Sequence, residues 1–175
     1  MSQHRPSDDL DSLWDRFRRG DRAALSRLLT LVGREETRTQ ISRLLTQHDA
    51  PASTPVVAFT GGAGAGKSTL LGSLAREIGE RGERLGLRGW EPESPLTRGA
   101  LLGDRCRIVA GATPEQTFVR SLSAASGGQG LAAHLDLLVA LLRAFRFDRV
   151  GIETVGAGQG DAAIRDIADG VALVL

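Results

Sequence analysis

The chain has 175 residues, a net charge of +1 at neutral pH, 41% hydrophobic and 25% charged residues, and a single cysteine, Cys106. This length predicts one domain with a small appendage, and the balanced charge gives no reason to expect a nucleic-acid or membrane partner. One cysteine excludes an internal disulfide and a multi-cysteine metal site. No apolar run approaches the roughly 20 residues of a transmembrane helix, and the polar amino terminus does not resemble a signal peptide. We therefore expect a cytoplasmic protein.

The first 50 residues carry helical patterns. Apolar residues recur at i, i+3, i+4 and i+7 from Leu10, and a second such stripe follows Asp21, a residue that suits a helix amino-terminal cap. A third helix is indicated around Ile41. These stripes are expected to pack against the rest of the fold, with a partner-binding surface as the alternative. A polar, proline-bearing linker then separates a helical extension, residues 1–50, from residues 51–175.

From Val56 onward the pattern alternates between strands and helices, which predicts an α/β fold with a mostly parallel sheet. Strands are expected at 56–60, 83–90, 148–155 and 171–175, and helices at 67–80, 114–124, 131–145 and 161–168. Arg88 and Gly89 suit a buried strand poorly, and Arg149 and Gly151 weaken a later one. Tolerated variation at a sheet edge and loss of function both remain as explanations.

Residues 61–68, GGAGAGKS, satisfy the pattern GxxxxGK[ST] between an expected strand and an expected helix. Glycines let the chain curl so that successive N–H groups face phosphate oxygens, and the helix adds the positive end of its dipole. Lys67 is the only lysine in the chain. Its compact ammonium fits beside the β- and γ-phosphates, where the wide fork of an arginine does not. Ser68 offers a hydroxyl to Mg²⁺, and Thr69 can reach a phosphate.

Two other interpretations of this glycine-rich stretch are weaker. The GxGxxG fingerprint of dinucleotide-binding proteins fails, because its third glycine is missing whether counted from Gly62 or from Gly64. A strand–helix turn without any ligand is possible in principle but does not account for the full match. The sequence therefore predicts a nucleoside-triphosphate site.

A second element of such a site follows the strand at 148–155. Glu153 closes its apolar part, and a carboxylate in this position normally holds Mg²⁺. Gly156 can offer its backbone N–H to the γ-phosphate, and the segment GAGQGD, 156–161, fits a loop that switches on hydrolysis.

Four stretches together resemble the MeaB/ArgK family of P-loop GTPases, which includes the MMAA-type proteins: FTGGAGAGKSTL (59–70), EPESPLTRGALLGDR (91–105), FVRSL (118–122) and FDRVGIETVGAGQGDAAIRDIADGVALVL (147–175). The resemblance runs from about residue 10 to the carboxyl terminus. It implies a SIMIBI-type P-loop fold and a chaperone of the adenosylcobalamin-dependent methylmalonyl-CoA mutase. In that family the nucleotide state gates delivery or removal of cobalamin, and full-length relatives have a dimerisation arm, which makes a homodimer an option.

The resemblance also implies roles for individual residues. Phosphate binding falls to a contiguous set: Gly61, Gly62, Ala63, Gly64, Ala65, Gly66, Lys67, Ser68 and Thr69. It also implies that four residues lie around Mg²⁺: Ser68, Glu91, Asp104 and Glu153. Lys67 is expected to neutralise charge on the γ-phosphate. The loop from Glu153 to Gln159 is expected to position water or to act as the second switch.

Several features depart from the family pattern. Glu91 stands where the family has aspartate, which lengthens a carboxylate expected near Mg²⁺. The Asn-Lys-x-Asp loop that reads guanine is absent from these 175 residues, so a preference for GTP over ATP is not encoded here. The last strand is expected to leave an open edge unless another chain covers it.

The leading hypothesis is a Mg²⁺-dependent GTPase that assists a methylmalonyl-CoA mutase or a related adenosylcobalamin-dependent mutase. A relative that binds nucleotide or mutase without efficient hydrolysis is the first alternative. An ATP-dependent small-molecule kinase is the second, although it requires an acceptor-binding lid for which the sequence gives no sign.

Overall fold

The computed structural model describes residues 10–48, 54–62, 64–91, 116–123, 134–154 and 164–175. Its strands form one sheet in the order β3-β2-β4-β1-β5, and every pairing is parallel. The strands are β1 (Val56–Thr60), β2 (Leu85–Glu91), β3 (Thr117–Ser123), β4 (Arg149–Glu153) and β5 (Gly170–Leu173). The predicted α/β fold with a parallel sheet is confirmed.

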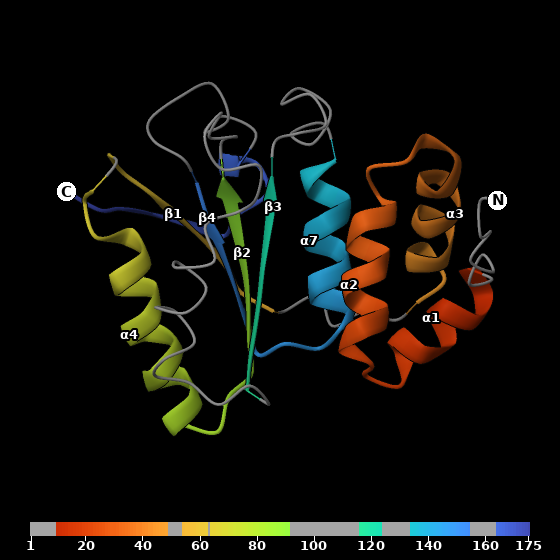
Figure 1. Ribbon diagram of the computed structural model, residues 1–175, viewed down its shortest axis with the longest axis horizontal. Coiled ribbons are helices and arrows are strands. Elements are labelled where there is room, and N and C mark those ends of the chain that lie inside the picture. Colours follow the sequence, from red (N-terminus) through yellow and green to blue (C-terminus); the bar gives the residue numbers. More distant parts are fainter. Residues whose placement is uncertain (1–9, 49–53, 63, 92–115, 124–133, 155–163) are drawn as a thin grey trace, which may run out of the picture.

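Helices cover both faces of this sheet (Figure 1). They are α1 (Leu10–Arg18), α2 (Arg22–Leu31), α3 (Glu35–Thr46), α4 (Lys67–Glu80) and α7 (Leu135–Ala144). In Figure 1, α4 lies on one side of the sheet, and α7 lies on the other with α2, α1 and α3 beyond it. The predicted amino-terminal helices are confirmed, including the cap of α2 by the Asp21 side chain.

The buried apolar side chains form one cluster on each face of the sheet. On the face of α1, α2, α3 and α7, called here the helical face, α1 and α2 contribute to the same core as β1, β4 and α7. The α4 face has a smaller core, made of Phe59, Leu71, Ala75, Ile78, Leu85 and Leu87. Apolar residues on both faces explain why β1 reads as an almost continuous apolar run.

The predicted helix over 114–124 is wrong, because residues 117–123 form β3. Phe118 belongs to the core of the helical face and Val119 packs against that of the α4 face, which is the alternation of a strand. Arg120 therefore lies on this strand. It is half-buried on β3, and its guanidinium donates hydrogen bonds to Ser26 Oγ and Thr30 Oγ1 of α2, both at 2.6 Å.

The explanation of unusual strand residues by a sheet edge is also wrong, because β2 and β4 are interior strands. Arg88 of β2 is 2% exposed and lies in register with Arg120 of β3. Burial, together with the charge of Arg120, lowers the pKa of Arg88 from its ordinary value to about 10. The glycine at position 151 of β4 is explained by packing, because a Cβ there would lie 2.5 Å from Leu87 Cδ2.

The remaining predicted elements are confirmed where the structure describes them. The helix expected at 131–145 is α7, and the strands expected near 148 and 171 are β4 and β5. In the helix expected at 161–168, the described part is a single turn closed by the Ala168 N–H on the Ile164 carbonyl, at 2.9 Å. None of the helices in the described part of the chain is long and apolar enough to cross a bilayer.

Candidate functional site

The loop between β1 and α4 lies at the carboxyl end of β1, where parallel sheets place their ligands. Gly66 precedes the helix with φ 89°, a left-handed conformation that suits glycine and turns the chain into α4. The first backbone N–H groups of α4, from Lys67 onward, lack partners within the helix and face its amino-terminal end. The loop therefore presents the donors and the dipole that an anion requires.

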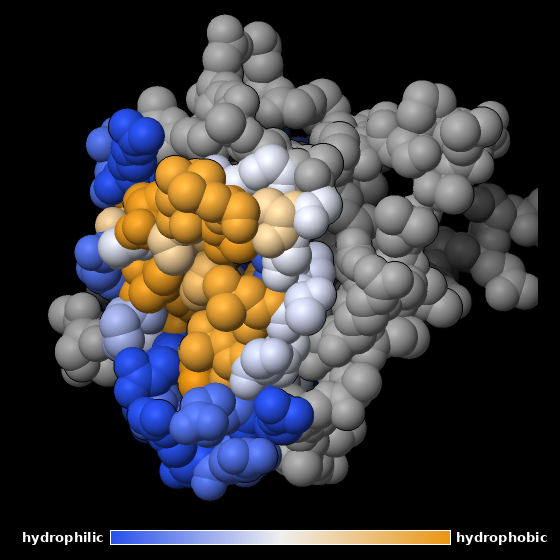
Figure 2. All heavy atoms as spheres, turned by 90° about the vertical axis from the view of Figure 1, so that its left-hand side faces the viewer, coloured by the Kyte–Doolittle hydropathy of each residue, from blue (hydrophilic) through white to orange (hydrophobic). Residues whose placement is uncertain are grey.

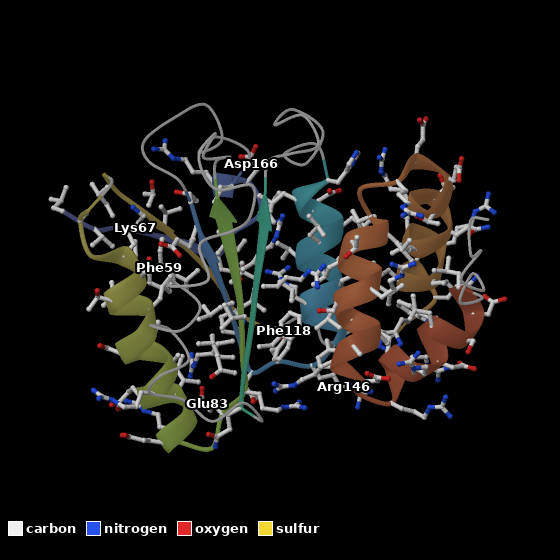
Figure 3. The ribbon with its side chains drawn as sticks, in the orientation of Figure 1. Phe59, Lys67, Glu83, Phe118, Arg146 and Asp166 are labelled. Carbon is white, nitrogen blue, oxygen red and sulfur yellow. The ribbon has the colours of Figure 1, made fainter. Side chains whose placement is uncertain are left out.

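The Lys67 side chain is folded back into this loop. It is 9% exposed, and its Nζ donates to the carbonyl oxygens of Gly61 and Gly62 at 2.8 and 2.9 Å. In Figure 3, Lys67 lies at the upper end of α4 near Phe59, and Glu83 lies beyond the lower end of that helix. An ammonium has three donors, so this geometry fixes its position while leaving one N–H for a phosphate oxygen.

The next residue connects the loop to β4. Ser68 Oγ donates a hydrogen bond to Glu153 Oε1 at 3.0 Å, across 85 positions of sequence. Glu153 lies in register with Phe59 at the end of β1, and the Thr154 N–H donates to the Phe59 carbonyl at 2.9 Å. A hydroxyl and a carboxylate oxygen at this distance are the hard oxygen ligands that Mg²⁺ prefers, so both residues fit that ion.

Other residues predicted for the site are only partly placed. Glu91 is the last residue of β2, two positions beyond Gly89, which pairs with Glu153. The backbone of Glu91 therefore lies at the same carboxyl end of the sheet as Glu153. Ala63, Asp104, Gly156 and Gln159 lie outside the described residues. Within the described residues no three His, Cys, Asp or Glu side chains gather as a metal cluster. A Mg²⁺ bound through one or two protein ligands, phosphates and water does not need such a cluster.

One contact of the loop escaped the sequence analysis. A Cβ at Gly61 would lie 2.2 Å from the Val174 carbonyl oxygen, and the Val174 N–H donates to the Thr60 carbonyl at 2.8 Å. The chain just after β5 therefore supports the first turn of the loop. The apolar run at 171–175 predicts a strand, but nothing in it signals that the strand end touches residue 61.

A sequence profile described as methylmalonyl-CoA mutase-associated GTPase MeaB matches residues 25–175. The chain belongs to the MeaB family of P-loop GTPases. A Pyrococcus abyssi relative named as a GTPase is 39% identical over 166 residues, which cover 94% of this chain and 51% of that protein. The chain thus spans about half the length of the curated relatives it matches.

Two further comparisons extend this assignment. A protein of Cupriavidus metallidurans named fused isobutyryl-CoA mutase is 37% identical over 148 residues, 83% of this chain and 13% of that much longer protein. The crystal structure of a LAO/AO transport system kinase superposes with a TM-score of 0.69 at 25% identity, covering 99% of this chain and 51% of that one. The second comparison agrees with the P-loop fold described above.

Proposed function

We propose that this member of the MeaB family binds Mg²⁺ and GTP at the loop of residues 61–69 and hydrolyses the γ-phosphate. The observation that carries the proposal is that Lys67, Ser68 and Glu153 converge at the carboxyl ends of strands β1 and β4. A cation held by the loop's own carbonyls and a paired hydroxyl and carboxylate match the phosphate and Mg²⁺ functions of a P-loop site.

Each residue has a separate task in this proposal. The backbone N–H groups of the loop hold the phosphate oxygens, and Lys67 balances the negative charge that builds up on the γ-phosphate. Ser68 and Glu153 would hold Mg²⁺, which supplies further charge neutralisation when bound. Water adds to the γ-phosphorus, the bond to the β-γ bridging oxygen breaks, and GDP and inorganic phosphate leave. Gln159 and its loop are proposed to position that water.

The proposed partner is an adenosylcobalamin-dependent acyl-CoA mutase, whose cofactor loading the nucleotide state would gate. Support comes from the family description and from the fused isobutyryl-CoA mutase, which contains a region similar to this chain. Binding of nucleotide or mutase without efficient hydrolysis is a second candidate. The observation that favours it is the buried Arg88 in β2, the strand that ends in Glu91.

The test is to titrate GTP and ATP with Mg²⁺ by calorimetry, then to follow phosphate release with and without methylmalonyl-CoA mutase. Lys67→Ala should weaken GTP binding by about 10- to 100-fold, because a hydrogen bond to a charged group is worth roughly 1.5–3 kcal/mol. Lys67→Arg should bind almost as weakly, since it keeps the charge but not the shape. Arg76→Gln, an exposed site on the same helix, is the matched control and should bind normally.

The outcomes separate the candidates. GTP binding with phosphate release that mutase stimulates supports the full proposal. Binding without release supports the second candidate. Equal binding by the Lys67→Ala variant would overturn both, since no nucleotide would then use this loop. Because Lys67 is the only lysine, an amine-reactive reagent followed by peptide mass spectrometry gives an independent measurement: Mg²⁺ and GTP should slow its modification.

A further inference from the structure

Three threonine hydroxyls are buried without a hydrogen-bond partner in the part of the chain that the structure describes: those of Thr60, Thr117 and Thr154. Thr154 is 5% exposed and Thr117 is 6% exposed. Thr54, which is also buried, shows the usual arrangement, because its Oγ1 donates to the Phe147 carbonyl at 3.1 Å. A buried hydroxyl without a partner destabilises the state that contains it, so each of the three needs an explanation.

Two of these hydroxyls belong to neighbouring strand ends at the candidate nucleotide site. Thr60 is the last residue of β1 and directly precedes the phosphate loop at Gly61. Thr154 directly follows Glu153, the last residue of β4. Phe59 pairs with Glu153, so Thr60 and Thr154 are the next neighbours along the two strands. Neighbouring strands lie about 4.8 Å apart, a gap that two hydroxyls turned toward each other bridge.

Both side chains belong to the helical face of the sheet. Ala58 and Ile152, two positions earlier on the same strands, are part of the core of that face, and side chains two apart on a strand share a face. Glu153 points the other way, since its carboxylate accepts a hydrogen bond from Ser68 of α4. Figure 2 views the molecule from the side that carries α4 in Figure 1. The two threonines lie on the face of the sheet that is turned away from this side.

The two strand ends carry different halves of the candidate site. β1 leads into the loop whose carbonyl oxygens hold Lys67, and β4 carries the carboxylate that pairs with Ser68. In the proposed function both halves hold one ligand, the loop through its phosphates and the Ser68–Glu153 pair through Mg²⁺. Binding of that ligand therefore fixes the end of β1 relative to the end of β4. This relative position decides whether the two threonine hydroxyls meet.

We propose that Thr60 and Thr154 are positioning residues of the nucleotide site. Their hydroxyls, which are not bonded in the structure, bond to each other when Mg²⁺ and GTP bind. One hydroxyl then donates and the other accepts, which removes the cost of burying both without a partner. The bond fixes the carboxylate of Glu153 relative to the phosphate loop and tightens nucleotide binding. This inference rests on the proposed function and extends it to two side chains on the far face of the sheet.

Valine substitutions test the pair, because valine has nearly the shape of threonine without the hydroxyl. In the chain without nucleotide, Thr60→Val and Thr154→Val should each raise the thermal unfolding temperature by about 2–4 °C, since an unsatisfied buried hydroxyl is removed. The same variants should bind Mg²⁺ and GTP about fivefold more weakly by calorimetry, since the bound state loses a hydrogen bond. A purely structural role predicts no such opposite effects on stability and affinity.

Thr117 provides the matched control. It is the first residue of β3 and pairs with Leu85, the first residue of β2, so it lies at the opposite end of the sheet from the phosphate loop. Thr117→Val removes an equally buried hydroxyl, and it should raise the unfolding temperature by a similar amount and leave GTP affinity unchanged. Thr154→Ser keeps a hydroxyl and should bind GTP within about twofold of the wild type.

The double variant Thr60→Val/Thr154→Val tests whether the two hydroxyls act on each other. It should bind GTP no more weakly than either single variant, because all three lack the same hydrogen bond. A crystal structure with Mg²⁺ and a non-hydrolysable GTP analogue gives a direct measurement, since the Oγ1 atoms of the two threonines should lie about 2.8 Å apart.

Each outcome decides one point. Wild-type affinity in both valine variants, or a loss that Thr117→Val shares, overturns the inference and leaves the proposed function standing. Losses that add in the double variant overturn the pairing of the two hydroxyls. Lower unfolding temperatures in both valine variants would mean that the hydroxyls already have partners without nucleotide, which also overturns the inference. A wild-type chain that binds no GTP overturns the proposed function, and the inference with it.

Discussion

The two faces of the sheet differ in how much packing covers them. The helical face is covered by α1, α2, α3 and α7, whose buried side chains share one core with β1 and β4 (Figure 1). Within the residues that the structure describes, the α4 face is covered by one helix and has a core of six buried side chains. In Figure 3, Phe118 points toward the larger layer, whereas Phe59 lies beside α4 close to Lys67.

The candidate nucleotide site lies on the thinly covered face. Its loop begins at Gly61, rests on Val174 and leads into α4, next to the exposed apolar side chains of β5. Regions that rearrange around a ligand are drawn from the less stable parts of a protein. The comparison suggests that the helical face supplies most of the stability and that the α4 face supplies the part that responds to ligands. Substitutions on the two faces test this division.

The largest effect is expected from a cavity in the core of the helical face. Leu25→Ala, at a side chain that is fully buried, should lower the free energy of unfolding by about 4 kcal/mol. Leu71→Ala, at a side chain 1% exposed on the α4 face, should cost about 2–3 kcal/mol, because the smaller core around it can relax more fully. Urea unfolding followed by circular dichroism measures both values. An equal or larger cost at Leu71 would contradict the division.

The same experiment tests whether the two faces unfold together. Trp14 stacks on Phe17 with ring centroids 4.7 Å apart, so its fluorescence reports on the helical face in a Trp90→Phe background. Since both faces pack on one sheet, we expect the fluorescence and circular-dichroism midpoints to coincide.

A second effect concerns the buried charge of the helical face. Arg88→Met should raise the free energy of unfolding by about 2 kcal/mol at pH 7, because replacing a buried charge by an apolar side chain of similar volume is often stabilising. Leu87→Met, on the other face of the same strand, is the control and should change it by less than about 1.5 kcal/mol in the opposite direction. A loss of stability in Arg88→Met would show that the guanidinium makes a net favourable contribution.

The gain from Arg88→Met should depend on pH. The folded pKa of Arg88, about 10, is below its ordinary value, so the unfolded chain holds the proton more tightly than the folded one. The penalty for the charged form is therefore complete below about pH 10 and fades as the pH rises from there toward the ordinary pKa of arginine. The advantage of Arg88→Met over the wild type should shrink above pH 10. The chain has one lysine and no tyrosine, and its other arginines are common to the wild type and the variant, so the difference between the two proteins isolates Arg88.

A third, smaller effect compares two glycines of the sheet interior. A Cβ at Gly86 would lie 2.7 Å from Phe147 Cδ2, and this ring is packed against Phe118 and Phe145. A Cβ at Gly151 would meet the flexible end of Leu87. Gly86→Ala should therefore cost about 1.5 kcal/mol, and Gly151→Ala clearly less, because a rotating Leu87 makes room. Thermal unfolding of the two variants checks this order, and a reversed order would contradict it.

The candidate nucleotide site was largely predictable because its requirements are local. Residues 61–68 contain, in one stretch, the glycines that the loop conformation requires and the lysine and serine that its chemistry requires. The structure starts α4 at Lys67, as predicted. The partnership of Ser68 with Glu153 was predicted across 85 positions only because a Mg²⁺ site needs a carboxylate at a neighbouring strand end. No such chemical rule connects Gly61 with Val174, so that contact was missed.

The β3 side of the sheet was not predictable either, because no chemical rule in the sequence links its strands. Phe118 and Leu122 are four residues apart, as on a helix face, and only pairing with β2 makes residues 117–123 a strand. The burial of Arg88 follows from the position of β2 between β3 and β4, which its own sequence does not indicate. The chemical signal of a helix cap, by contrast, was interpreted correctly at Asp21.

The smallest effect tests that cap. The Asp21 carboxylate accepts hydrogen bonds from the Ala23 and Ala24 N–H groups at 2.8 and 3.3 Å, and forms an ion pair with Arg16 at 2.8 Å. Asp21→Ala should lower the free energy of unfolding by about 1 kcal/mol, and Asp21→Asn by a few tenths, since asparagine keeps the cap. The hydrogen bond from Arg16 holds the pKa of Asp21 below its ordinary 3.8. The contribution is therefore complete above that value and is lost as the pH falls through the lower folded pKa. Urea unfolding at pH 7 and pH 3 should show the cost of Asp21→Ala shrinking at the lower pH, and a constant cost would mean that the carboxylate charge does not matter.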